Sequence, residues 1–343
     1  MALGALPPST DDRVMWDIWE SVFKLPLVTV HDEAGTFGAL SDEALTTEEL
    51  ATKLGLDARA LGMHLAALAG MELVDRRAGK WSASPEARRW LHPDGKGYWG
   101  GFLFGFRERT KLHAQLLETL KTGTRPGNLA AAGSAEWERG HMSDEAAQRI
   151  ARFMHAHSQA PALGAAQQPE FASVRHLMDI GCGSGVYGIE IARAHPDMRV
   201  TLMDLEAMTR AASTYVEAAG LSDRIDTAGV NMFEQEWPSG PDAHFFANVF
   251  HDWSEETNRL IARKSFEALP SGGRIFLSEI LMDDDLDGPW YAASFSLLML
   301  VGTLGKQYSL LEYTDILESA GFTNVTARRH GGGYYSLVSA TKP

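Results

Sequence analysis

The sequence has little of several features that mark common functional classes. Its 343 residues include one cysteine, Cys182, which excludes an intramolecular disulfide framework and a zinc site built on cysteines. Lys and Arg number 31 against 45 Asp and Glu, so the formal net charge of −14 argues against broad binding to nucleic acid. The longest apolar stretch, residues 292–304, is interrupted by small polar residues and is shorter than the roughly 20 residues of a membrane-spanning helix. We therefore expect a reducing, cytoplasmic setting with no membrane or nucleic-acid partner.

The remaining composition is that of a globular chain. Hydrophobic residues make up 45% and charged residues 22% of the sequence, which excludes a disordered or collagen-like protein. At roughly 150 residues per domain, the length predicts two domains. The character of the sequence changes near residues 167–169 (QQP), so we expect one domain over residues 1–165 and another over residues 166–343.

The first of these domains has the pattern of a winged helix. Apolar residues recur at helical spacing over residues 14–23, and residues 46–49 (TTEE) form a capping-box pattern that opens another helix. A further helix is predicted over residues 58–70, followed by a short hairpin within residues 73–82. A winged helix alone suggests DNA binding, but the predicted recognition helix holds a single arginine and the chain is acidic.

The second domain alternates short β-rich runs with helical ones. Strands are predicted over residues 174–180, 199–204, 243–249, 274–279 and 334–340. Helices are predicted between them, over residues 188–194, 207–219 and 255–269. This alternation predicts an α/β fold in which a parallel sheet carries helices on both faces.

A glycine-rich loop joins the first predicted strand of this domain to a helix. Residues 176–185 read HLMDIGCGSG, and glycines there let the backbone turn sharply and let a ligand approach closely. Gly183 opens a match to the dinucleotide pattern G-x-G-x-x-G, and Asp204 follows 21 residues later, where a ribose-binding acid is needed. Asp179 disfavours a pyrophosphate and suits the ammonium group of a methionine moiety. The loop therefore resembles the first motif of class I S-adenosylmethionine (SAM) methyltransferases, with a nicotinamide or flavin site and a ligand-free turn as alternatives.

A second motif follows the third predicted strand of the domain. Residues 248–256 read NVFHDWSEE, which puts His251 at the C-terminal end of a strand, where open α/β sheets bind ligands. An unperturbed imidazole titrates near pH 6.5, so His251 is suited to remove a proton from a phenol or a similar acidic hydroxyl. The alternative is that His251 caps the next helix or packs in the core.

Two motifs in sequence carry a resemblance to a known family. NVFHDWSEE and the later EALPSGGRIFLSE resemble the small-molecule O-methyltransferases, which include the plant caffeate and flavonoid enzymes, acetylserotonin methyltransferase and bacterial natural-product enzymes. The resemblance covers nearly the whole chain. It implies a Rossmann-like class I SAM methyltransferase domain with an N-terminal helical, winged-helix dimerisation domain, and thus a homodimer acting on a small molecule. Residues 152–158 (RFMHAHS) resemble the family's helix that crosses over the active site.

The resemblance also implies a set of residues that bind SAM. Asp179 and the loop glycines would hold the methionine part, and Asp204 the ribose hydroxyls. Residues 231–233 (NMF) match the family's Asp-Met-Phe, with Asn in place of Asp, so that one adenine contact becomes neutral. The full set is Ser158, Asp179, Gly181, Gly183, Gly185, Asp204, Leu205, Asn231, Met232, Phe233 and Asn248.

For catalysis, the resemblance implies a histidine that acts as general base and is oriented by neighbouring carboxylate side chains. His251 would be the general base, and Glu279, at the end of the fourth predicted strand, would orient it, since a carboxylate bound to imidazole fixes the tautomer and stabilises the imidazolium. The family usually has a second glutamate beside the base, in a G-x-E-R-T pattern. Residues 305–309 read GKQYS, so Gln307 replaces that glutamate and adds no negative charge. This departure leaves the acceptor atom open.

The residues expected at the substrate are mostly aromatic. They are Tyr98, Trp99, Phe106, Phe153, Met154, His157, Asp252, Trp290, Tyr291, Phe295, Leu298 and Tyr308. A hydroxyl acceptor must lose a proton, whereas a thioether acceptor becomes a sulfonium, which aromatic faces stabilise. Arg107, Arg109 or Arg139 would then receive a substrate carboxylate.

Transfer to a hydroxyl oxygen is favoured, because His251 and Glu279 are both present. The main alternative is S-methylation of a small thioether acid such as 4-methylthio-2-hydroxybutyrate. N-methylation, a non-methylating relative and a SAM-sensing winged-helix regulator are further alternatives. No metal site is expected, because His155 and His157, two residues apart on a helix, point to different sides.

Overall fold

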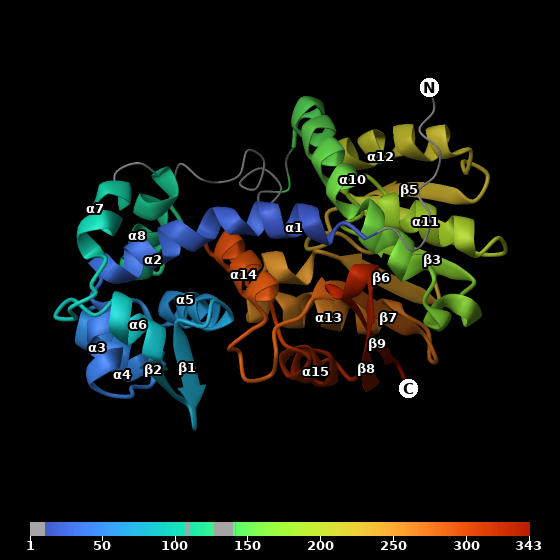
Figure 1. Ribbon diagram of the computed structural model, residues 1–343. Coiled ribbons are helices and arrows are strands. Elements are labelled where there is room, and N and C mark those ends of the chain that lie inside the picture. Colours follow the sequence, from blue (N-terminus) through green and yellow to red (C-terminus); the bar gives the residue numbers. More distant parts are fainter. Residues whose placement is uncertain (1–10, 108–109, 127–139, 141) are drawn as a thin grey trace. The chain divides into compact units, whose positions relative to one another are not determined.

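The computed structural model describes residues 11–107, 110–126, 140 and 142–343. The chain forms two compact units (Figure 1). The sheet unit comprises residues 1–13, 131–281 and 310–343, and the helical unit comprises residues 14–130 and 282–309, each as far as it is described. None of the helices in the described residues is long and apolar enough to cross a membrane.

The helical unit is built from short helices and one hairpin. Its helices are α1 (Arg13–Glu20), α2 (Lys24–Glu33), α3 (Thr36–Asp42), α4 (Thr47–Leu54), α5 (Ala58–Gly70), α6 (Pro85–Trp90), α7 (Gly100–Arg107), α8 (Lys111–Thr122) and α14 (Trp290–Gly302), with the 3₁₀ turn η1 (Ser21–Phe23). Strands β1 (Val74–Arg77) and β2 (Lys80–Ala83) pair antiparallel.

The predicted winged-helix pattern matches α4, α5 and the β1–β2 hairpin. Thr46 and Glu49 form both hydrogen bonds of the capping box at the start of α4, at 3.1 and 2.8 Å. Asp57 caps α5 by accepting the backbone N–H of Ala60 at 2.8 Å. Short side chains thus satisfy the free N–H groups that begin both helices.

The first predicted helix is present as α1, but its apolar stripe faces outward. Val14, Ile18 and Val22 are 64%, 61% and 52% exposed. Trp16 and Glu20, on the other side of the helix, are buried instead. The helical spacing of these apolar residues therefore marks a solvent-exposed face of the helix, which no other described part of the chain packs against.

The sheet unit contains one seven-stranded sheet. Its strands are β3 (His176–Ile180), β4 (Arg199–Asp204), β5 (Ile225–Gly229), β6 (Ala243–Ala247), β7 (Arg274–Ile280), β8 (Thr323–His330) and β9 (Tyr335–Thr341). They lie in the order β5-β4-β3-β6-β7-β9-β8, and β9 runs antiparallel to both of its neighbours. The strand order reverses between β3 and β6, which creates a crevice at the C-terminal ends of these strands.

Helices cover both faces of this sheet (Figure 1). Helices α10, α11 and α12 pack together on one face, and α13 and α15 pack together on the other. These elements are α10 (Asp144–Ala166), α11 (Val186–Ala194), α12 (Glu206–Ala219), α13 (Glu255–Ala268) and α15 (Leu310–Ser319), with the 3₁₀ turns η2 (Pro169–Ser173), η3 (Phe250–Asp252) and η4 (Gly331–Gly333). The α/β fold with helices on both faces of the sheet is thus confirmed.

The two units divide the chain differently from the predicted boundary near residue 165. Helix α10 belongs to the sheet unit, because it packs along α11 and α12. Residues 282–309 return to the helical unit, because α14 packs against α5. At this contact a Cβ on Gly70 would lie 2.7 Å from the Trp290 Cα, so the two helices approach closely only because residue 70 is glycine.

Candidate active site

A pocket opens at the C-terminal ends of β3, β4 and β6, where the strand order reverses. It holds about 980 Å³, including the space at its open mouth, and all its lining residues belong to the sheet unit. Gly185 is the one residue of the predicted SAM set that does not line it. The predicted SAM residues that do are Ser158, Asp179, Gly181, Gly183, Asp204, Leu205, Asn231, Met232, Phe233 and Asn248.

The glycine loop after β3 needs glycine for two separate reasons. Gly181, Gly183 and Gly185 have φ angles of 69°, 56° and 75°, in the left-handed region that other residues rarely adopt. A Cβ on Gly185 would also lie 2.6 Å from the side chain of Leu202, and one on Gly181 would lie 2.8 Å from Val249. Gly185 therefore shapes the loop by packing on β4, outside the pocket.

Two carboxyl groups lie at this loop, of which Asp179 is buried and Asp204 is half-buried. Asp179 accepts the backbone N–H of Gly188 at 3.1 Å, and Asp204 accepts those of Gly183 and Leu205 at 2.9 and 2.7 Å. Burial, reinforced by the charge of Asp204, raises the pKa of Asp179 to about 7, although the Gly188 N–H opposes the shift. Burial likewise raises the pKa of Asp204 to about 6. A cation in the pocket would favour the ionised form of both groups.

The pocket wall carries buried polar atoms that have no hydrogen-bond partner among the described residues. Ser184 Oγ and Asn248 Oδ1 are among them. Asn248 is a non-glycine residue at a φ of 54°, held there by its backbone N–H to the carbonyl of Ser278 at 3.2 Å. Both atoms are suited to bind a polar ligand, because a buried polar group without a partner destabilises the protein. Sequence reasoning had not assigned Ser184, although it stands within the glycine loop.

The far end of the pocket is aromatic. The rings of Phe233 and Trp253 lie 4.7 Å apart in an edge-to-face contact, and both line the pocket. The Asn231 side-chain carbonyl accepts the backbone N–H of Phe233 at 3.0 Å, so it fixes the loop that presents this ring. Trp253 was missed by the sequence interpretation, although the Trp in NVFHDWSEE was the available signal.

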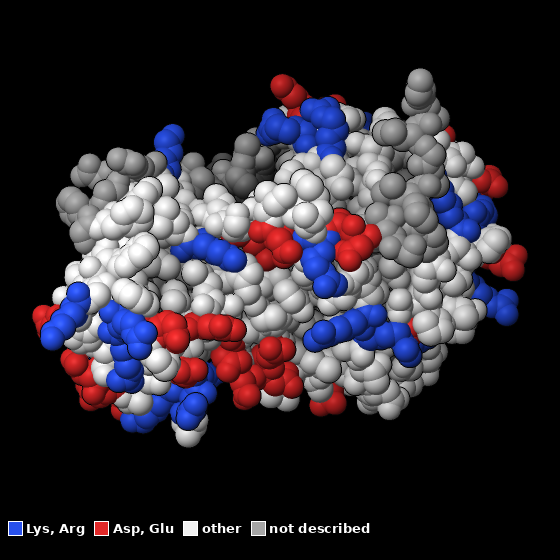
Figure 2. Space-filling model, viewed as in Figure 1, with Lys and Arg blue, Asp and Glu red and all other residues white. Residues whose placement is uncertain are grey.

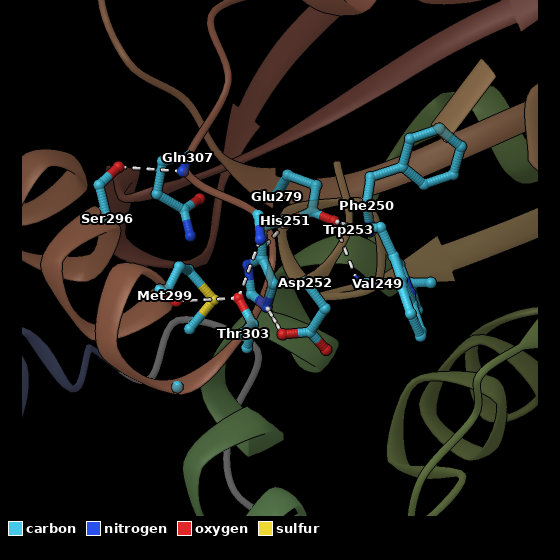
Figure 3. Close-up of polar contacts among 12 residues, drawn as sticks. Val249, Phe250, His251, Asp252, Trp253, Glu279, Ser296, Met299, Thr303 and Gln307 are labelled. Atoms are coloured by element: carbon cyan, nitrogen blue, oxygen red, sulfur yellow. Dashed lines mark hydrogen bonds and ion pairs between the residues drawn. The ribbon is translucent and has the colours of Figure 1, made fainter. Parts of the chain in front are cut away.

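The predicted base and its acid lie together beside this pocket (Figure 3). His251 Nδ1 lies 3.2 Å from Glu279 Oε2, and both side chains are buried. This contact has the distance of an ion pair without the angle of a hydrogen bond. The other oxygen, Glu279 Oε1, accepts the backbone N–H groups of Val249 and Phe250, both at 3.1 Å. The carboxylate is therefore fixed by main-chain donors while it faces the imidazole.

Helix α10 contributes three of the predicted substrate residues. Met154 lines the pocket, whereas Phe153 is exposed and stacks on His157 with the ring centroids 5.7 Å apart. His157 Nδ1 lies 2.8 Å from Ser158 Oγ. Burial, with a contribution from His251, lowers the pKa of His157 to about 4, so its ring is neutral at physiological pH.

Asp252, another predicted substrate residue, belongs to the sheet unit and lines the pocket. The remaining predicted substrate residues and Gln307 belong to the helical unit. The Gln307 backbone N–H donates to Ser296 Oγ at 2.9 Å (Figure 3). Phe295 packs edge-to-face against Trp16 and Trp19 at 5.7 Å each. Trp99 is exposed, Tyr308 is buried, and the remaining side chains, Phe106, Trp290, Tyr291 and Leu298, are half-buried.

Tyr98 and Arg107 are already engaged inside the helical unit. Tyr98 donates a hydrogen bond of 2.6 Å to Asp32 Oδ1, and Arg107 donates to Oδ2 of the same residue. The expectation that Arg107 receives a substrate carboxylate is therefore not supported, because a buried aspartate occupies it. Arg109 and Arg139 lie outside the described residues.

The fold and the pocket together define a class of enzyme. An acid at the end of β3, a left-handed glycine loop and a second acid at the end of β4, on a sheet with this strand order, are the features of class I SAM-dependent methyltransferases. The chain belongs to the family described as the O-methyltransferase domain, whose model matches residues 114–323. It is therefore a SAM-dependent O-methyltransferase of this family.

Known proteins support the same assignment. The 3-hydroxy-5-methyl-1-naphthoate 3-O-methyltransferase of Streptomyces sahachiroi is 32% identical over 341 residues, which cover 99% of this chain and 98% of that one. An O-methyltransferase family 2 protein from Planctomyces limnophilus, solved with apigenin, is 24% identical, with a TM-score of 0.85 over 100% of both chains. Human N-acetylserotonin methyltransferase, solved with SAM, is 20% identical, with a TM-score of 0.61 over 98% and 99% of the chains.

The pocket residues fit SAM. The acids Asp179 and Asp204 suit its ammonium group and its ribose hydroxyls, and the edge-to-face pair of Phe233 and Trp253 suits the adenine ring. Ser184 Oγ and Asn248 Oδ1 supply polar atoms that the protein itself leaves unpaired among its described residues.

Proposed function

We propose that the enzyme methylates a hydroxyl group on a small aromatic molecule, with His251 as general base. The observation that carries this proposal is the contact of 3.2 Å between His251 Nδ1 and the buried carboxylate of Glu279. SAM, when bound, supplies a methyl carbon attached to a positively charged sulfur. The acceptor hydroxyl gives its proton to His251, and its oxygen becomes a better nucleophile.

Glu279 fixes which imidazole nitrogen does this work. A carboxylate beside Nδ1 favours the tautomer that carries its proton there, which leaves the lone pair of Nε2 available to the acceptor. The same carboxylate stabilises the imidazolium after the proton has moved. Because two backbone N–H groups hold Glu279, the orientation of His251 is preset before substrate binds.

An aromatic acceptor is supported by the relatives and by the character of the candidate residues. The relative from Streptomyces acts on a hydroxynaphthoate, and the Planctomyces protein was solved with apigenin. The candidate substrate residues of the helical unit are mainly aromatic, which suits a planar ring. The alternative, S-methylation of a small thioether acid, loses one proposed carboxylate anchor, because Arg107 binds Asp32.

The test replaces His251 with Ala and measures turnover of hydroxylated aromatic acceptors. General-base catalysis contributes roughly 10²–10⁴-fold, so a loss of this size is expected. Binding of S-adenosylhomocysteine, measured by calorimetry, should stay intact and show that the variant is folded. His92→Gln, on the helical unit, is the matched control and should keep full turnover. Turnover by His251→Ala close to that of the wild type would refute the proposal.

We further propose that the helical unit serves dimerisation and covers the substrate. The outward stripe of Val14, Ile18 and Val22 on and after α1 is an apolar face of the kind that a second copy would bury. A DNA-binding role is less well supported. Arg59, the arginine of α5, donates to the carbonyls of Leu304 and Gly305, and Figure 2 shows basic side chains interspersed with acidic ones. The reducing, cytoplasmic setting stays a prediction.

A further inference from the structure

Gln307 stands where the family usually has its second glutamate. A different carboxylate, that of Asp252, nevertheless lies close to the imidazole of His251. Asp252 Oδ1 lies 3.7 Å from His251 Nε2, and Glu279 Oε2 lies 3.2 Å from Nδ1 (Figure 3). We propose that Asp252 is a positioning residue that supplies the second negative charge needed to stabilise the imidazolium of His251. The inference rests on the proposed function of His251 as base.

The local structure holds Asp252 at this place. Residues 250–252 form the 3₁₀ turn η3, in which the backbone N–H of Asp252 donates to the carbonyl of Val249 at 3.1 Å. Asn258, which is fully buried on α13, donates from its side chain to the carbonyl of Phe250 at 2.8 Å. Hydrogen bonds thus fix both ends of the turn. Its tight geometry lets the short side chain of Asp252 reach the ring of His251.

The carboxylate of Glu279 is shared between the imidazole and the main chain. Its Oε1 already accepts hydrogen bonds from two backbone N–H groups, and these donors partly neutralise the negative charge that faces the ring. Its Oε2 meets His251 at ion-pair distance but outside hydrogen-bond geometry. Because His251 is only 4% exposed, water contributes little to stabilising a cation there. A second carboxylate therefore has a large effect on how readily the ring accepts a proton.

The position of Asp252 matches the place where charge develops. In the proton transfer, the O–H bond of the acceptor breaks, an N–H bond forms at Nε2, and the bonding electron pair stays on the acceptor oxygen. The new N–H therefore forms on the edge of the ring that faces Asp252. His157 also interacts electrostatically with His251, and its neutral ring does not cancel this charge.

Asp252 also lines the donor pocket, so its effect must be separated from SAM binding. The substitution Asp252→Asn keeps the shape and removes the charge. Asp252→Glu keeps the charge. Glu256→Gln, at an exposed position on α13, removes the same charge a few residues away and is the matched control.

The direct measurement is the pKa of His251, followed by NMR in enzyme that carries ¹⁵N-labelled histidines and bound S-adenosylhomocysteine. The His251 signal is assigned by its loss in His251→Gln. We expect Asp252→Asn to lower this pKa by about one pH unit, because a carboxylate within about 4–6 Å shifts a pKa by 1–3 units. Turnover should fall about tenfold, and its acidic limb should move to lower pH. Asp252→Glu and Glu256→Gln should keep a pKa close to that of the wild type.

The inference is overturned if the His251 pKa in Asp252→Asn equals that of the wild type while calorimetry shows normal binding of S-adenosylhomocysteine. It is also overturned if Glu256→Gln lowers the pKa equally, since a general charge effect would then explain the shift. Failure of the proposed base has a different signature, because it would appear as retained turnover in His251→Gln whatever the Asp252 variants do.

Discussion

His31 Nε2 and His64 Nδ1 lie 2.9 Å apart in the core of the helical unit, and neither side chain is exposed to solvent. The other nitrogen of His31 contacts Thr36 Oγ1 at 2.8 Å. Burial lowers the pKa of His64 to about 3, and burial together with His64 lowers that of His31 well below its usual value. Both rings are therefore neutral in the folded protein at pH 7.

This pair predicts that acid destabilises the helical unit. An unfolded histidine binds a proton near pH 6.5, but folded His64 does so only near pH 3, so stability is complete above pH 6.5 and is lost as the pH falls. The loss approaches about 1.4 kcal/mol per pH unit for each ring. Thermal unfolding of wild type and His64→Gln between pH 7 and 5 checks this. The variant should lose less stability, and equal slopes for the two proteins would contradict the prediction.

The raised pKa values of Asp179 and Asp204, about 7 and about 6, predict a pH-dependent donor site. A cationic ammonium group favours ionised carboxylates, so affinity for S-adenosylhomocysteine should weaken as the pH falls from about 8 to about 6. The fall should approach tenfold per pH unit below the pKa of each carboxylate that must lose its proton, so Asp179 accounts for most of it in this range. Calorimetric titration at several pH values measures it.

Asp179→Asn should bind S-adenosylhomocysteine at least about tenfold more weakly and flatten this pH dependence. Asp226→Asn, on an exposed ion pair with Arg199, is the matched control and should behave like the wild type. Undiminished affinity of the wild type at the acid end of the range would show that the raised pKa values do not govern binding.

Alanine substitutions at two glycines with similar backbone angles distinguish the cost of backbone strain from the cost of a steric clash. Gly185 and Gly220 have φ angles of 75° and 70°, but a Cβ meets Leu202 at 2.6 Å in the first and nothing within 4 Å in the second. Gly220→Ala should cost about 1 kcal/mol of unfolding free energy from backbone strain alone. Gly185→Ala should cost clearly more and also weaken binding of S-adenosylhomocysteine. Chemical denaturation of both variants measures this, and equal losses would contradict the collision with Leu202.

The exposed stripe of α1 predicts a solution dimer. Light scattering should report about twice the chain mass of 37.5 kDa. Ile18→Asp should shift the protein toward the monomer, because it places a charge in an apolar interface. Leu260→Asp changes a residue of α13 that is 42% exposed and should leave the assembly unchanged. A wild type that is monomeric at all concentrations would remove the basis for this role of α1.

Patterns that depend on local chemistry were predictable from the sequence. The glycine loop and the acid at Asp204 follow from strand ends that converge at one edge of a parallel sheet. The pairing of His251 with Glu279 was implied by the family resemblance, and the two side chains lie 3.2 Å apart. Two strands were missed. β5 and β8 lie at the edges of the sheet, where most side chains are exposed and the alternation of apolar residues disappears.

Other features depend on packing between distant segments. The sequence around Arg107 suggests an arginine that could bind an anionic ligand. In the structure, Arg107 instead donates a hydrogen bond to Asp32, which lies 75 residues earlier in the chain. The assignment of α10 to the sheet unit and of residues 282–309 to the helical unit likewise depends on which helix faces fit together. Neither periodicity nor spacing carries such information, because both describe only neighbours along the chain.

The place of β9 has a consequence for synthesis on the ribosome. β9 lies between β7 and β8, and its Ser336 pairs with Glu279. Until residues 335–341 have been translated, β7 has an open edge at the very strand that carries Glu279. We expect the nascent chain to need protection from aggregation up to that moment, and deletion of residues 335–341 to prevent folding of the sheet.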